Sequence, residues 1–212
     1  MRQSWITPVT LRGTIVRLEP LEARHAPDLL AAADPALFQH TAQHPKEWTV
    51  GGFEQEIAGV NAIQDSVALA IVLQSSGKAI GRTTFMDIRP EHRGVEIGRT
   101  WIGRVYHGTT VNPEIKFLML RHAFETLTPT AIRVQFITSG TNLHSQAAIA
   151  KLGAVREGVL RHQRIGTIPG SPEPVVRDAV FYSILAAEWP EAKRRLETRL
   201  AAQHSGEPMQ SR

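Results

Sequence analysis

The 212-residue sequence contains no cysteine. A chain without thiols cannot form disulfides, bind a metal through thiolates or attack a substrate with a cysteine nucleophile. Small secreted scaffolds that depend on disulfides are therefore excluded. Any chemistry that this chain performs must use other side chains.

Long hydrophobic runs are absent as well. The longest strongly apolar run, Val67 to Leu73, is far shorter than the ~20 residues of a membrane-spanning helix. Residues 1–13 contain no apolar core of signal-peptide length. We therefore expect a cytoplasmic protein without a membrane partner.

The sequence also lacks the common motifs of several enzyme classes. It contains no G-x-G-x-x-G, Walker A or G-x-S-x-G pattern, so dinucleotide redox, nucleotide hydrolysis and serine-hydrolase chemistry have no support. Ser75 to Lys78 fits S-x-x-K, but it lies in an expected hairpin turn and not at the start of a helix. The nine histidines form no H-E-x-x-H pair, and we expect no metal site.

Neither sign of charge dominates. The chain has 24 basic and 20 acidic residues, which gives a net charge of +4 at pH 7. A surplus of this size permits nucleic-acid binding but does not indicate it. The one basic cluster, at Lys193, Arg194, Arg195 and Arg199, lies on an expected terminal helix, where a solvated face explains it. We expect no nucleic-acid partner.

The hydrophobic residues, 42% of the chain, are arranged with the periods of both strands and helices. Alternating or short apolar runs predict strands at residues 14–19, 67–73, 79–86, 95–102, 131–137, 157–164 and 177–184. Helical spacing predicts helices at residues 22–33, 53–63, 113–127, 142–152 and 188–203. This order predicts a mixed α+β fold. We expect one domain over residues 1–203 and a disordered tail over 204–212.

A loop from Gly108 to Glu114 follows an expected strand and opens an expected helix. Gly108 permits a tight turn, Asn112 suits the N-cap position and Pro113 suits the first helical turn. Free backbone amides at such a helix start, together with the helix dipole, form an anion site that suits a pyrophosphate. The alternative is a well-capped helix with nothing bound, whose dipole Glu114 itself satisfies.

Three more polar residues accompany the two expected helix starts. Lys116 lies four residues after Asn112 on the same helix face, where it could neutralise a phosphate or pair with an acidic neighbour. Asn142 and Ser145 share one face of the first turn of the next helix, and both could reach a ligand. Helix capping explains Asn142 equally well, and an ordinary surface position explains Ser145.

Glu96 lies within an expected strand, between apolar Val95 and Ile97. A carboxylate that is secluded there would have a raised pKa, which suits a general base. The alternative is that Glu96 faces solvent or pairs with an arginine such as Arg82 or Arg99.

Several segments, taken in order, resemble the GNAT N-acetyltransferase superfamily. They are Glu96 to Ile102, Gly108 to Lys116, Asn142 to Ser145 with Lys151 to Ala154, and Glu157 to Arg161. The branch that fits is the RimJ/RimL-like one, which contains the ribosomal-protein N-terminal acetyltransferases. The likeness covers roughly residues 11–200, and the order and spacing of the segments carry it.

The resemblance implies a twisted mixed sheet of about seven strands, with helices on both faces, that splays open between the strands at 95–102 and 131–137. Acetyl-CoA would lie in that V. Its expected binding residues are Trp101, Ile102, His107, Gly108, Thr109, Thr110, Val111, Asn112, Lys116, Asn142 and Ser145. The loop amides of 107–112 would hold the pyrophosphate, Asn142 would bind the pantetheine or its neighbouring backbone, and amides at the end of the Trp101 strand would steady the thioester carbonyl.

The implied activity is acetyl-CoA-dependent transfer of an acetyl group to a primary amine, directly within a ternary complex, because no cysteine can carry the acetyl group. Glu96 would accept the amine proton through water, and either Ser145 or a water would protonate the departing thiolate. Many relatives place a tyrosine acid where this chain has Ile149. That departure, together with Thr110 in the pyrophosphate loop, is the reason to keep a second alternative, a CoA-binding or sensory module without turnover.

The acceptor amine is a protein N-terminus or a small molecule, and the sequence does not choose between them. Residues 34–64 and 166–175 are expected to wall the acceptor pocket, and His92 and His162 are candidates to touch the acceptor. The sequence does not determine the oligomeric state, but dimers are common in this branch, so the resemblance allows a homodimer.

Overall fold

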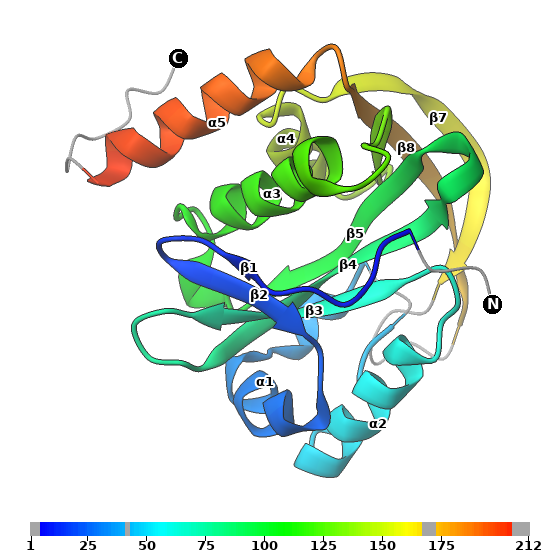
Figure 1. Cartoon of the computed structure of the whole chain (residues 1–212). Helices are drawn as coiled ribbons and strands as arrows, with labels where there is room; N and C mark the ends of the chain where they lie inside the picture. The colour runs from blue at the N-terminus through cyan, green and yellow to red at the C-terminus, as the bar shows by residue number, and fades with distance from the viewer. Residues whose placement is uncertain (1–4, 41–42, 167–172, 205–212) are drawn as a thin grey trace.

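The computed structural model describes residues 5–40, 43–166 and 173–204. Within them lies one mixed sheet in the order β1-β2-β3-β4-β5-β6-β8-β7, with helices on both faces (Figure 1). The strands are β1 (Leu11–Arg12), β2 (Val16–Pro20), β3 (Val67–Leu73), β4 (Ala79–Arg89), β5 (Gly94–Ile102), β6 (Arg133–Ser139), β7 (Val155–Gly166) and β8 (Val175–Leu185). The α-helices are α1 (Ala26–Ala32), α2 (Val50–Asn61), α3 (Val111–Arg121), α4 (Leu143–Ala150) and α5 (Trp189–His204). The short turns are η1 (Ala23–His25), η2 (Pro35–Phe38), η3 (Pro90–His92), η4 (Arg104–Tyr106) and the π-turn η5 (His122–Thr126) that extends α3.

The expected α+β class and open mixed sheet are confirmed, but the sheet has eight strands where about seven were expected. The additional strand is β1, in which Leu11 and Arg12 pair with Leu18 and Arg17. Two residues are too few to produce an alternating pattern, so the sequence does not reveal this strand. Of the expected tail, His204 is the last residue of α5, and 205–212 lie outside the described residues.

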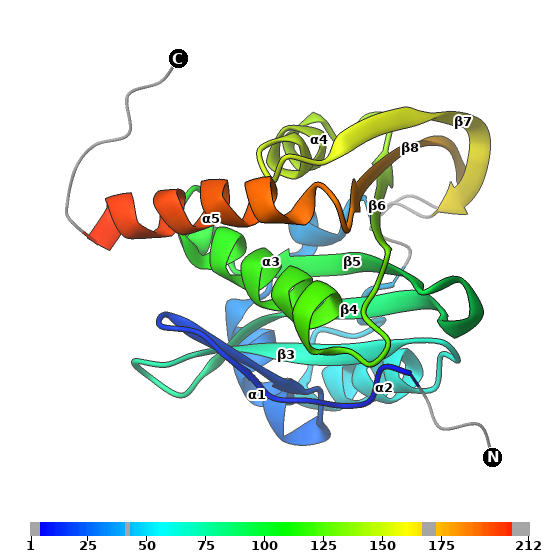
Figure 2. The same ribbon diagram turned by 45° about the horizontal axis from the view of Figure 1, so that its top comes forward.

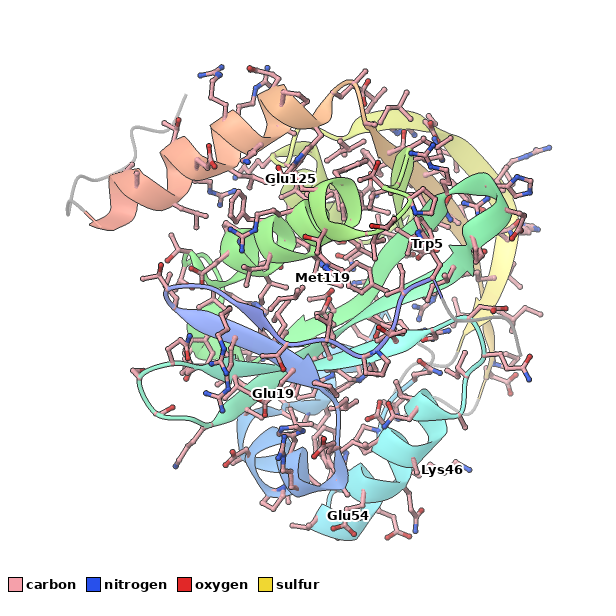
Figure 3. The ribbon with its side chains drawn as sticks, viewed as in Figure 1. Trp5, Glu19, Lys46, Glu54, Met119 and Glu125 are labelled. Atoms are coloured by element: carbon pink, nitrogen blue, oxygen red, sulfur yellow. The ribbon has the colours of Figure 1, made fainter. Side chains whose placement is uncertain are left out.

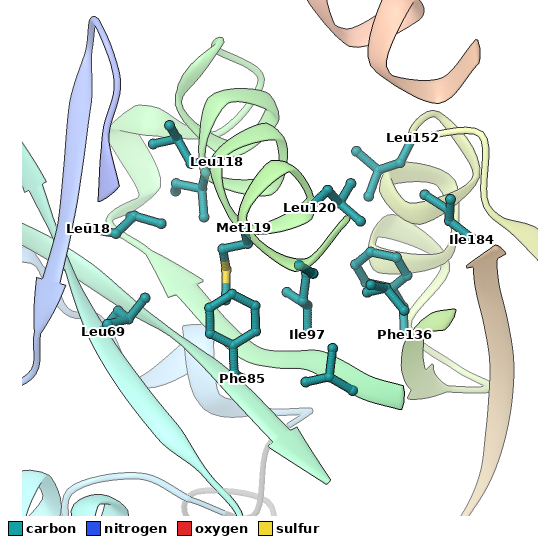
Figure 4. Close-up of a cluster of buried hydrophobic side chains, with 14 of the residues drawn as sticks. Leu18, Leu69, Phe85, Ile97, Leu118, Met119, Leu120, Phe136, Leu152 and Ile184 are labelled. Carbon is teal, nitrogen blue, oxygen red and sulfur yellow. The ribbon is translucent and has the colours of Figure 1, made fainter. Parts of the chain in front are cut away.

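Two hydrophobic layers sandwich the sheet (Figures 1 and 2). On one face α1 and α2 pack against β3, β4 and β5 around Phe38 and Phe53. On the other face α3 crosses the strands, with α4 and α5 beside it. Figure 4 shows Phe85 and Ile97 of the sheet beneath Met119 of α3. The sequence between 113 and 127 is strongly apolar because α3 is buried between the sheet and α5.

The terminal helix α5 is held to the end of α3 by polar contacts as well as by packing. Glu125 accepts hydrogen bonds from Trp189 Nε1 at 2.7 Å and from Lys193 Nζ at 2.9 Å (Figure 3). Within the expected basic cluster, Arg194 and Arg195 pair with Glu191 of the same helix. These intrahelical pairs at the surface are typical of a solvated helix face.

The sheet opens between β5 and β6. These parallel strands pair only at Gly94 with Arg133, Val95 with Val134, and Glu96 with Gln135. Beyond this point β5 follows β4 to Ile102, whereas β6 follows β8 to Ser139. The expected V is therefore present, and Glu96 lies at its apex.

Candidate active site

Glu96 is buried at the apex of the V, with 3% of its surface exposed. Burial raises the pKa of its carboxyl to about 7. Arg164, the Gln135 amide and Arg99 oppose that rise, and Asp87 adds to it. The predicted raised pKa is thus confirmed, and the solvent-facing alternative is wrong.

A β-bulge lies three residues after Glu96. Gly98 is opposite Thr84 and Trp101 is opposite Arg82, so two residues of β5, Arg99 and Thr100, share one partner on β4. Arg99 has a φ of 49°, which side chains rarely adopt outside bulges and turns. The bulge reverses the alternation of β5: Val95 and Ile97 face α3 before it, and Trp101 faces the other layer after it.

The arginine expected as one partner of Glu96 has another partner. Arg82, 1% exposed, donates from Nη2 to Glu56 of α2 at 2.6 Å and from Nη1 to the Arg99 carbonyl at 3.2 Å. A buried ion pair of this kind holds its two elements in register because either charge alone would be costly. It ties α2, from the segment expected to wall the acceptor pocket, to the strand pair β4–β5.

The loop that precedes α3 differs from its prediction at the cap. The helix begins at Val111, so Thr110 occupies the N-cap position and Asn112 is the second helical residue. Asn112 is therefore not the N-cap, because the first helical bond runs from Glu114 N–H to the Thr110 carbonyl. Pro113 lies in the first turn as predicted. Gly108 has a φ of 77°, which its predicted turn requires.

The backbone amides of this loop fit an anion. Within the described part of the chain, those of Gly108, Thr110 and Asn112 donate to no protein acceptor. Glu114 does not compete for them, because its carboxylate accepts the N–H groups of Thr14, Ile15 and Val16 at 2.7–2.9 Å. Unpaired amides at a helix start are the arrangement that binds a pyrophosphate.

Lys116 does not point to the mouth of this loop. Its Nζ donates to Thr100 Oγ1 at 2.6 Å beneath α3, and Thr100 is also bonded to Thr83. Burial lowers the pKa of this amine to about 7. Lys116 therefore neither reaches a phosphate position at the loop nor pairs with an acidic residue, because its side chain lies on the inner face of the helix.

The first turn of α4 forms the other arm of the V. Asn142 caps this helix by accepting the Ser145 N–H at 3.1 Å, as its structural alternative predicted, and the Ser145 side chain is half-buried. His144 stacks on His107 of the loop, with ring centroids 5.9 Å apart. The two arms therefore meet through imidazole rings. No pattern in the sequence indicates a role for His144.

The remaining predicted site residues lie at the end of β5, in the loop before α3 and on α4. Trp101 packs on Phe38, with ring centroids 5.2 Å apart, and Ile102 enters the α3 core, so both side chains are buried at this end of β5. Ile102 also hydrogen-bonds His107 Nε2 through its carbonyl at 3.1 Å. Ile149 is buried in the core. Thr109 is bonded to the Tyr106 carbonyl, and Val111 N–H to Thr109 Oγ1, which shapes the loop.

The two histidines considered for the acceptor are separated. His92 is exposed in η3, before the start of β5, and faces Glu91. His162 lies in a bulge of β7 with a φ of 53°. Of the expected wall at 166–175, residues 167–172 lie outside the described part of the chain.

No helix in the described ranges combines the length and apolarity needed to cross a membrane. Among the same residues, no group of three or more acidic or histidine side chains is arranged to hold a metal ion.

Comparison with known proteins gives one consistent result. A model of the acetyltransferase (GNAT) domain matches residues 16–155. A solved structure from T. thermophilus, described as an acetyltransferase, is 39% identical with a TM-score of 0.82 over 92% of this chain and 99% of that one. A GCN5-related N-acetyltransferase from Brucella melitensis is 26% identical with a TM-score of 0.84 over 93% and 88% of the two chains.

The fold is shared more widely. Mycobacterium smegmatis RimJ, solved with CoA-disulfide, is 22% identical with a TM-score of 0.68 over 91% of this chain and 93% of that one, a likeness of fold alone. No curated protein matches the sequence. Because the domain model spans well over half of the 212 residues and the V between β5 and β6 has the predicted form, the chain belongs to the GNAT acetyltransferase family.

Proposed function

We propose that this protein is an acetyl-CoA-dependent N-acetyltransferase that transfers the acetyl group directly to a primary amine. The observation that carries the proposal is Glu96, a buried carboxyl with a pKa of about 7 at the apex of the V. Such a group is half ionised near neutral pH, which suits a general base. The RimJ/RimL-like branch, the cytoplasmic location and the homodimer remain predictions of the sequence.

Acetyl-CoA, when bound, supplies the acetyl thioester. The unpaired amides of Gly108, Thr110 and Asn112 fit its pyrophosphate. In this proposal His107, Thr109 and Val111 shape the same loop, and backbone groups of Trp101 and Ile102 lie beside the thioester. Asn142 keeps its helix cap and offers its amide to the pantetheine, whereas Lys116 would have to leave Thr100 to contribute.

Glu96 accepts the proton of the acceptor amine, through water or directly, because an ammonium ion has no lone pair with which to attack. The chain has no thiol to carry the acetyl group, so the amine attacks the thioester itself. Ser145, in the first turn of α4, is the proposed source of the proton for the leaving thiolate.

The primary test is the Glu96→Gln substitution, which keeps the shape of the side chain and removes its basicity. Turnover should fall about 10²- to 10⁴-fold, while calorimetry with acetyl-CoA should give an unchanged dissociation constant. The wild-type kcat/KM should rise with pH through about 7, because only the ionised carboxylate accepts a proton. This rise should disappear in the variant.

Glu54→Gln is the matched control, because Glu54 is an exposed carboxylate on α2 (Figure 3). It should change neither turnover nor affinity. Release of CoA can be followed with a thiol reagent, since the protein has no cysteine of its own. Unchanged turnover in Glu96→Gln would refute the role of Glu96. Acetyl-CoA binding without CoA release for any amine would instead identify a CoA-binding module.

A further inference from the structure

Two bulges on opposite sides of the V bring two arginines to Glu96. The bulge of β5 contains Arg99. On β7, three residues between Leu160 and Arg164 are opposite the single residue Asp178 of β8, whose carboxylate accepts the His162 N–H at 2.8 Å. Bulges bend strands and redirect the side chains that follow them. Arg164 is the first residue to pair again after this one.

The end of β7 and the start of β8 lie toward the α1–α2 layer. Arg164 pairs with Arg177 of β8, and Arg177 donates from Nη2 to the Gln39 carbonyl, next to η2, at 2.8 Å. Figure 2 shows β7 and β8 as a strongly curved ribbon at the edge of the sheet. Arg164 is an exposed side chain, and its charge lowers the pKa of both Glu96 and Arg99. The end of β7 therefore adds a positive charge that acts on the apex of the V.

Within the described part of the chain, Arg99 and Arg164 form no ion pair with a carboxylate. Arg82 is neutralised by Glu56, but neither Arg99 nor Arg164 lies within ion-pair distance of a described carboxylate. Arg99 Nη1 is buried without any hydrogen-bond partner. Glu207, in the C-terminal segment, is the only acidic side chain among the residues that the structure does not describe.

Other nearby groups do not neutralise the positive charge of Arg99 and Arg164. Asp87 already accepts the Gln135 amide and pairs with Arg89. Glu96 itself is only partly ionised near neutral pH. A buried guanidinium nitrogen without a partner is costly, because it has lost its hydration and gained no hydrogen bond. The arrangement is therefore complementary to an anion that enters the V.

We propose that Arg99 and Arg164 form a carboxylate-binding site, and that the acceptor is therefore an amine that carries a carboxylate near its amino group. This rests on the proposed function, since Glu96 would take the proton from the same molecule. Guanidinium groups bind carboxylates through paired, charge-assisted hydrogen bonds, which orient as well as attract. The same two charges repel polycationic acceptors such as polyamines and aminoglycosides.

The test compares amines that differ only in the carboxylate. L-Alanine, L-phenylalanine and L-glutamate are each assayed against their own amides. A peptide arm compares Asp-Ala-Ala-amide with Asn-Ala-Ala-amide, which separates a free amino acid from an acidic peptide N-terminus. In at least one of these comparisons, the amine that carries the carboxylate should have a kcat/KM about 10- to 100-fold higher than its amide, the range expected for a charge-assisted hydrogen bond.

The decisive variant is Arg164→Gln. It should reduce the carboxylate preference to within about threefold, mainly through KM, and leave acetyl-CoA affinity unchanged; a tenfold loss corresponds to about 1.4 kcal/mol. Arg161→Gln is the matched control, because Arg161 is an exposed arginine on the same strand, before the end of the bulge. It should keep the preference. Arg99→Gln provides a second variant on the other strand.

A binding readout separates this inference from the proposed function. Lactate, phenyllactate and 2-hydroxyglutarate, which have the carboxylate but no amine, are titrated into the CoA complex by calorimetry. Binding that weakens in Arg164→Gln supports the carboxylate site even where no amine is acetylated, and such a result would refute only the transferase proposal. Acetylation of amines with no carboxylate preference, or a preference that persists in Arg164→Gln, overturns the inference.

Discussion

Lys116 is a buried amine whose hydrogen-bond partner is a neutral hydroxyl, Thr100 Oγ1. An ammonium group in this position has lost most of its hydration, and that loss lowers its pKa to about 7 from the usual value of 10.5. Near neutral pH the folded protein therefore holds a lysine that is partly uncharged. Such a residue costs stability at any pH at which the lysine of the unfolded chain is protonated.

The Lys116→Met substitution should stabilise the protein by about 1–4 kcal/mol at pH 7, the gain seen when buried charged groups are replaced by apolar ones. Between pH 7 and 10.5 the unfolded chain retains the lysine proton and the folded protein does not, so wild-type stability rises with pH. The gain should therefore be full below pH 7 and shrink toward pH 10.5. Denaturant unfolding at pH 7 and pH 10 measures it.

Lys46→Met is the control for that substitution, because Lys46 is exposed (Figure 3). It should leave the free energy of unfolding unchanged at both pH values. A gain that is equal at pH 7 and pH 10 would contradict the lowered pKa of Lys116.

Helix α2 carries three glycines, and two of them, Gly52 and Gly59, have opposite surroundings. A Cβ on Gly52 would collide with the Glu47 carbonyl oxygen, because the incoming chain passes against the first turn of the helix. A Cβ on Gly59 would meet nothing within 4 Å. Close backbone approach thus requires glycine at the first position, whereas the second position only lowers helix propensity.

Gly59→Ala should stabilise the protein by up to about 1 kcal/mol, the difference in helix propensity between the two residues. Gly52→Ala should destabilise it by about 1–3 kcal/mol, because the well-packed contact with Glu47 must open. Urea unfolding of the two variants measures both effects. Equal shifts of the same sign would show that the chain before α2 does not pack as described.

The molecule as a whole is divided at the V. Beyond Glu96, strands β5 and β6 share no hydrogen bonds, and the contact between His107 and His144 joins the loop before α3 to α4. Under the proposed function, a ligand in the V would bind groups from both arms. A ligand that binds only the folded state stabilises it by mass action.

Acetyl-CoA at about 100 times its dissociation constant should add ~2.7 kcal/mol of stability, which for a chain of this length raises the Tm by about 5–10 °C. Thermal unfolding followed by fluorescence, with and without acetyl-CoA, measures the shift. Inorganic phosphate at the same concentration is the control and should give a much smaller shift. The absence of any shift with acetyl-CoA would contradict its binding to the folded protein.

The α+β class and the buried α3 follow from the sequence because each depends on local patterning. Helical and alternating periods show which residues face the core. They left the burial of Glu96 open, because neighbours in a strand point to opposite faces, and Glu96 is buried because helices cover the sheet on both faces. The cap of α3 was misplaced by two residues, from Thr110 to Asn112, because helix boundaries depend on backbone geometry as well as residue type.

The partners of the charged residues were decided by tertiary structure. Arg82 lies 26 positions from Glu56, and Arg164 lies 68 positions from Glu96, so no local spacing relates the members of either pair. The bulges that redirect Arg99 and Arg164 arise from mismatched strand register, which one strand alone does not reveal. Local sequence thus specifies the elements and their buried faces, whereas the charges that meet at the apex of the V depend on how distant strands pair.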